Sequence, residues 1–129
     1  MVMDIAGLGT HLLDCPRVRT LIDKHADKFL NEVYTPEEAA YCRDRSHSTE
    51  FYAGVWAAKE AVFRSLGMKW KRGVDWRDVV IEFDSAIDLR VTVRGETAER
   101  MKARGVAKVL VSFSYSRMFA TATAIAVRG

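Results

Sequence analysis

Residues 49–67 read Thr-Glu-Phe-Tyr-Ala-Gly-Val-Trp-Ala-Ala-Lys-Glu-Ala-Val-Phe-Arg-Ser-Leu-Gly, and this stretch decides the fold. Its large apolar residues recur at three- and four-residue steps, which predicts one long helix with an apolar stripe. Thr49 is the expected N-cap, and Gly67 is expected to end the helix in a left-handed conformation. We expect the rest of the chain to be organised around this helix.

Three charged residues interrupt the helix. Lys59 falls inside the apolar stripe, where an ammonium must reach solvent or find an anionic partner because an unpaired buried charge is costly. Glu60 and Arg64 lie one turn apart, on a side that also carries Ala53 and Ala57. One interpretation is a small-sided patch for a phosphate-rich ligand and a metal ion. The other is a buried helix with a snorkelling lysine and a surface Glu60–Arg64 ion pair.

The composition indicates one globular domain, residues 1–129, with a single core. The net charge of +3 favours an acidic partner or ligand without requiring nucleic acid. No apolar run approaches membrane-spanning length, so we expect no membrane association. Cys15 and Cys42 have neither metal-ligand spacing nor a disulfide framework, which favours a reduced, cytoplasmic setting.

Pattern and turn residues outline the remaining elements. Residues 2–13 predict a strand, which Gly7 and Gly9 thin so that a ligand or another backbone can approach closely. Residues 16–30 predict an amphipathic helix. Thr35-Pro36-Glu37-Glu38 is a capping box that opens a helix to about residue 45. Further along, we expect a helix at 96–104 and strands at 79–83, 89–93, 106–114 and 119–127. Strands in runs with helices on one side indicate an α+β architecture.

Two basic segments have open interpretations. Arg17, Lys24 and Lys28 are spaced to share one side of the helix at 16–30, as either a solvated face or a docking surface for an acidic protein. Residues 68–73 carry three cations and Trp70, as either a lip over a site or a simple basic loop.

Four segments resemble one protein family. Trp-Ala-Ala-Lys-Glu-Ala at 56–61, followed by Arg-Ser-Leu-Gly at 64–67, resembles the signature helix of the holo-acyl-carrier-protein synthases, the small 4'-phosphopantetheinyl transferases. Three further segments are similar to that family in the same order: Gly-Leu-Gly-Thr-His-Leu-Leu-Asp at 7–14, residues 28–38, and residues 111–120. Four matches in the right order are much more specific than any one of them.

The resemblance implies a fold, a reaction and an assembly. The fold is a small α+β domain with an antiparallel sheet and a long central helix, assembled as a homotrimer with sites between subunits. The reaction transfers the 4'-phosphopantetheine arm of coenzyme A to a serine of an acyl carrier protein. A divalent ion, usually Mg²⁺, neutralises the pyrophosphate while the serine oxygen attacks the β-phosphorus and 3',5'-ADP leaves.

The resemblance also implies roles for individual residues. Glu60 would hold the metal and take the serine proton through water, and Lys59 stands beside it in the catalytic set. Lys59 and Arg64 would hold the phosphates of coenzyme A. Gly67 and Tyr115 complete the expected coenzyme A contacts. The basic residues Arg17, Lys24 and Lys28 become the expected docking edge for the acyl carrier protein.

Several family positions differ in this chain. His11 stands where the family has an aspartate that binds metal. It is expected either as the second metal ligand beside Glu60 or as a strand residue that only fills space or hydrogen-bonds to backbone. An imidazole suits Mn²⁺ or Zn²⁺ better than Mg²⁺. Val55 and Tyr115 replace an arginine and a histidine of the family pattern. These changes leave open a divergent transferase or a non-catalytic relative that binds a carrier protein or a nucleotide. A nucleic-acid-binding domain is disfavoured, because no strand carries the aromatic pattern of an RNA-binding sheet.

Overall fold

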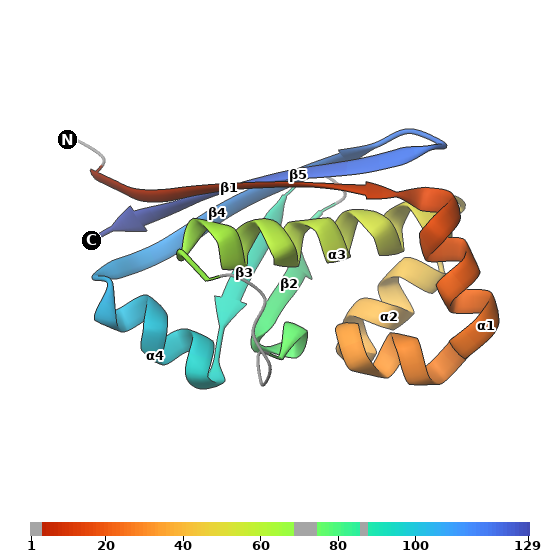
Figure 1. Cartoon of the computed structure of the whole chain (residues 1–129), viewed down its shortest axis with the longest axis horizontal. Coiled ribbons are helices and arrows are strands. Elements are labelled where there is room, and N and C mark those ends of the chain that lie inside the picture. Colours follow the sequence, from red (N-terminus) through yellow and green to blue (C-terminus); the bar gives the residue numbers. More distant parts are fainter. Residues whose placement is uncertain (1–3, 69–74, 86–87) are drawn as a thin grey trace.

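The central helix lies along a three-stranded antiparallel sheet in this computed structural model, which describes residues 4–68, 75–85 and 88–129 (Figure 1). The sheet has the strand order β1-β5-β4, and β2 and β3 form a separate antiparallel pair. The elements are β1 (Asp4–Asp14), α1 (Cys15–Val33), α2 (Pro36–Arg43), α3 (Ser48–Ser65), the 3₁₀ turn η1 (Trp76–Asp78), β2 (Val79–Phe83), β3 (Leu89–Val93), α4 (Gly95–Ala103), β4 (Val106–Tyr115) and β5 (Phe119–Arg128).

Small residues bring α3 very close to the sheet. The alanines of β5 that face α3 are fully or almost fully buried, as are Ala53 and Ala57 of the helix. A side chain on Gly9 would collide with the carbonyl of Ala61, and one on Gly54 would collide with the ring of Phe113. The expected close approach at Gly9 is therefore made by another backbone. Ala53 and Ala57 pack inside the protein and do not form an open patch beside Glu60.

The ends of α3 agree only in part with the predicted caps. Gly67 follows the helix with φ of +70°, which confirms the left-handed stop. Thr49 is not the N-cap: His47 holds that position without a side-chain capping bond. The Thr49 hydroxyl instead accepts a hydrogen bond from Arg19 Nη1 at 3.0 Å. Arg19 reaches it from α1, a tertiary contact that local spacing does not record.

The first two helices pack on α3 away from the sheet (Figure 1). The predicted capping box at α2 is confirmed, because Thr35 and Glu38 exchange side-chain and backbone hydrogen bonds. α1 is longer than expected and is kinked at Ala26, where φ is 42° and ψ is −122°. Because of the kink, residues 16–30 do not form the single regular helix that their spacing predicts.

The outer face of the three-stranded sheet is uncovered in the single chain. Leu8, Leu12 and Leu110 are 64%, 61% and 44% exposed on it. Within the ranges described, no helix is long and apolar enough to cross a membrane. The basic loop with Trp70 lies in the range 69–74, outside the described residues.

Candidate active site

Three predicted site residues, His11, Glu60 and Arg64, lie near one another where β1 packs against α3. Strand alternation turns His11 to the same side as Gly9, whose backbone lies against Ala61 and Arg64. The His11 imidazole is half-buried and feels the charges of Glu60 and Arg64. Burial lowers the pKa of His11 below its ordinary value of 6.5, Arg64 acts in the same direction, and Glu60 opposes them. The balance of these effects favours the neutral form of the His11 imidazole.

The Glu60 carboxylate is held by a residue that sequence reasoning missed. Trp76 Nε1 donates a hydrogen bond to Glu60 Oε1 at 2.7 Å in a partly buried setting. The Trp76 ring also meets Trp56 edge-on, with centroids 5.8 Å apart. No spacing in the sequence links residues 60 and 76, so only folding reveals this pair.

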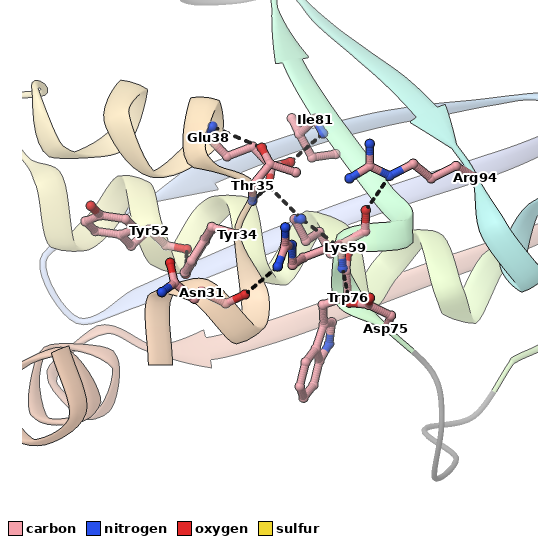
Figure 2. Close-up of polar contacts among 11 residues, drawn as sticks. Asn31, Tyr34, Thr35, Glu38, Tyr52, Lys59, Asp75, Trp76, Ile81 and Arg94 are labelled. Atoms are coloured by element: carbon pink, nitrogen blue, oxygen red, sulfur yellow. Dashed lines mark hydrogen bonds and ion pairs between the residues drawn. The ribbon is translucent and has the colours of Figure 1, made fainter. Parts of the chain in front are cut away.

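Lys59 does not join this cluster. Its side chain is fully buried, and Nζ lies 2.7 Å from Glu38 Oε1 and donates to the carbonyl of Trp76 at 3.2 Å (Figure 2). Glu38 also accepts hydrogen bonds from the backbone amides of Thr35 and Ile81. Lys59 was expected either to reach solvent or to find an anionic partner, and the structure shows the second outcome. Its position does not support the expected phosphate contact, because the charge is enclosed and already paired.

The donor set for a divalent ion is small. His11 and Glu60 offer one imidazole and one carboxylate, and no group of three or more His, Cys, Asp or Glu suited to a metal occurs in the described parts of the chain. Mg²⁺ is often bound by one or two protein carboxylates together with substrate phosphates. The residues therefore fit an ion that arrives with a phosphate-bearing ligand, and fit poorly as a free-standing metal site.

The family follows from comparison with known proteins. A family profile described as the 4'-phosphopantetheinyl transferase superfamily matches residues 7–124. A holo-[acyl-carrier-protein] synthase from Halothermothrix orenii is 32% identical over 125 residues, which cover 97% of this chain and 99% of the relative. The chain belongs to the holo-acyl-carrier-protein synthase family.

Solved structures agree with this family and with the predicted α+β fold. The holo-ACP synthase from Plasmodium yoelii matches with a TM-score of 0.84 at 24% identity, covering 100% of this chain and 99% of that one. The holo-(acyl-carrier-protein) synthase from Bacillus anthracis, in complex with CoA (3',5'-ADP), matches with a TM-score of 0.77 at 25% identity, covering 99% and 100%. The resemblance read from four sequence segments is confirmed.

Two expected coenzyme A contacts lie at opposite ends of α3 in this member of the family. Gly67 lies next to Arg64, to whose carbonyl its amide donates a hydrogen bond at 3.0 Å. Tyr115 is 40% exposed and lies beside Phe51, with ring centroids 5.4 Å apart. From residue 51 to residue 64 the helix rises about 20 Å. Phe51, which Tyr115 lies beside, is also about 14 Å from Glu60 along the helix axis.

The expected docking edge of this family member is exposed but interrupted. Arg17, Lys24 and Lys28 are all solvent-exposed on α1. The kink at Ala26 separates Lys28 from the other two, so their spacing no longer places all three on one helix side. Lys28 instead lines a small hollow of about 200 Å³ together with Glu32 and other residues of the same helix.

Proposed function

We propose that this chain transfers the 4'-phosphopantetheine arm of coenzyme A to a serine of an acyl carrier protein. The carrying observation is the family match over residues 7–124 together with the proximity of His11, Glu60 and Arg64, whose charges act on one another. In the reaction the serine oxygen forms a bond to the β-phosphorus of coenzyme A. The bond from that phosphorus to the bridging oxygen breaks, and 3',5'-ADP leaves with that oxygen.

Each residue of the cluster has a part in this proposal. Glu60, oriented by Trp76, accepts the serine proton through a water molecule and is the carboxylate available to a divalent ion. Arg64 is exposed at the end of α3 and binds phosphate oxygens. The neutral His11 imidazole is a second donor to the ion. When bound, Mg²⁺ or Mn²⁺ neutralises pyrophosphate charge.

The test is transfer from coenzyme A to purified acyl carrier protein, followed by the mass of the carrier. We expect transfer by the wild type and a large loss in Glu60→Gln, with Glu99→Gln, on the exposed surface of α4, as the matched control. The assay is run with Mg²⁺, Mn²⁺ and Zn²⁺ in turn, and the imidazole at position 11 predicts that Mn²⁺ or Zn²⁺ works better than Mg²⁺. Absence of transfer to any carrier with every metal would exclude the activity.

The proposal includes a homotrimer with sites between subunits. Two observations support it: the uncovered apolar face around Leu8 and Leu12, and the rise of about 14 Å along α3 between Phe51, which Tyr115 lies beside, and Glu60. Assembly would cover the first and would let Tyr115 of a neighbouring copy complete the site.

The carrier protein is proposed to dock on α1 through Arg17, Lys24 and Lys28. Acyl carrier proteins are acidic, so the attraction is electrostatic and is screened by salt. Arg17→Glu should slow association without changing the melting temperature, since Arg17 is exposed and only its backbone amide serves the Asp14 cap. If neither salt nor this substitution changes the association rate, the docking surface lies elsewhere. Two free, buried cysteines support a cytoplasmic setting for this chemistry.

A non-catalytic binding protein is the second candidate. It is favoured by the sparse donor set of His11 and Glu60. Calorimetry separates the two functions: coenzyme A binding that is insensitive to EDTA, together with no turnover, indicates binding alone.

A further inference from the structure

One residue, Trp76, is held by two neighbouring charged residues of α3. Its indole Nε1 donates to Glu60 Oε1 at 2.7 Å, and its carbonyl oxygen accepts from Lys59 Nζ at 3.2 Å. Lys59 is in turn paired with Glu38 at 2.7 Å. Figure 2 shows the part of this chain that runs from Glu38 through Lys59 to Trp76. The buried ion pair therefore connects to the Glu60 carboxylate through a single tryptophan.

The backbone around Trp76 is constrained as well. The Asp75 carboxylate accepts from the amide of Arg77 at 2.9 Å, and the Asp75 carbonyl accepts from the amide of Asp78 at 3.0 Å. The indole ring packs edge-on against Trp56 with an interplanar angle of 85°. Contacts other than the bond to Glu60 therefore hold both the backbone around Trp76 and its ring.

A glutamate carboxylate needs such a partner to hold one orientation. The terminal torsion of a glutamate side chain is broad, so a carboxylate at the surface of a helix rotates readily. A donor at 2.7 Å on Oε1 restricts that rotation. Partners of this kind, behind a metal ligand, typically alter metal affinity or activity when removed.

We propose that Trp76 is a positioning residue, which orients the Glu60 carboxylate toward the divalent ion and the attacking serine. The inference rests on the function proposed above for Glu60. It also gives the buried Glu38–Lys59 pair a role in that site, because Lys59 anchors the carbonyl of Trp76 and so fixes where the indole stands.

Trp56, the other tryptophan of this aromatic pair, provides a matched control. The indole N–H of Trp56 is buried and has no hydrogen-bond partner within the described residues. Trp56→Phe and Trp76→Phe therefore make the same chemical change in the same aromatic pair. Only the second substitution removes a donor from Glu60.

The first experiment tests the hydrogen bond without turnover. In ¹H–¹⁵N spectra of the intact protein, Glu60→Gln should move the indole signal of Trp76 and leave that of Trp56 in place. Calorimetric titration with Mn²⁺ in the presence of coenzyme A, without carrier protein, should show an affinity loss of about 10- to 100-fold in Trp76→Phe and less than about twofold in Trp56→Phe. Melting curves identify a variant that has lost its fold.

The second experiment measures transfer. Trp76→Phe should lower kcat by about 10- to 100-fold while the KM for coenzyme A changes less than about threefold, because the role proposed for the indole N–H is to orient Glu60. Equal behaviour of the two tryptophan variants, or an unmoved Trp76 signal in Glu60→Gln, overturns the positioning role. A wild type that binds Mn²⁺ but transfers nothing overturns the proposed function and leaves the binding data to decide on Trp76. A wild type that binds no Mn²⁺ overturns the positioning role.

Discussion

His11 shows how single charges compete at the residue scale. Burial and Arg64 disfavour the imidazolium, while Glu60 favours it, and the balance lowers the pKa of His11. The unfolded chain consequently takes up this proton first as the pH falls. The contribution of His11 to stability decreases as the pH drops below about 6.5 and levels off once the folded form is also protonated.

NMR titration of the His11 ring tests this balance. The pKa should lie below its ordinary value of 6.5. Glu60→Gln should lower it further because a favourable charge is removed, and Arg64→Met should raise it because a like charge is removed. Shifts of the same sign in both variants would contradict the arrangement of the three side chains.

The buried pair of Glu38 and Lys59 should dominate stability at the same scale. Glu38→Gln leaves the enclosed Lys59 ammonium without its anion, so we expect a loss of about 3–5 kcal/mol in the free energy of unfolding. Lys59→Met leaves the buried Glu38 carboxylate without its cation. The double variant should lose clearly less than the sum of the two, since the partners are removed together. Urea unfolding measures all three variants, and additive losses would show that the pair is not coupled.

At the scale of elements, the kink in α1 depends on one strained residue. Ala26 has φ of 42° and ψ of −122°, a region that a side chain rarely occupies. Glycine adopts this conformation without the penalty. The kink also decides how the basic residues of α1 are presented, because it separates Lys28 from Arg17 and Lys24.

Replacing Ala26 tests the kink. Ala26→Gly should stabilise the protein by about 1 kcal/mol, since it removes the strain. Ala40→Gly, inside the regular helix α2, should destabilise it by about 1 kcal/mol. Urea midpoints of the two variants provide the comparison. A destabilising Ala26→Gly would indicate that α1 continues without a break through residue 26.

At the scale of the whole molecule, the outer face of the three-stranded sheet exposes large apolar side chains. In the register of the sheet, Leu8 of β1 pairs with Ile125 of β5, which pairs with Leu110 of β4. This row of apolar side chains crosses all three strands on the side away from α3. A charge placed in this row would be buried without a partner if another copy covered it.

Light scattering coupled to size exclusion tests the assembly. The wild type should have about three times the 14.6 kDa mass of one chain, as a trimer requires. Leu8→Glu should reduce the mass to that of a monomer and reduce transfer, since we propose that a neighbouring copy completes the site. Ala103→Glu, on the exposed side of α4, is the control. A trimer that survives Leu8→Glu would place the interface on another face.

The features that could be predicted from the sequence are those formed by local interactions. The long helix, the capping box of α2, the stop at Gly67 and the strands β2 to β5 arise from residues close together in the chain, and their patterns predicted them within a few residues. The four family segments likewise identified the family, and they predicted His11, Glu60 and Arg64 as site residues. Such features depend on periodicity and spelling, which a linear chain records.

Only the tertiary structure decided which groups these residues face. Spacing placed Lys59 on an apolar stripe but did not show that its partner is Glu38, 21 positions away, or that Trp76 holds both Lys59 and Glu60. It also left open whether the small residues of α3 bordered a ligand or a sheet, and the alanines of β5 decide that. The physical reason is that burial and pairing depend on segments brought together by packing. The same residue spacing is compatible with many such neighbours, and the free energy of the whole fold selects among them.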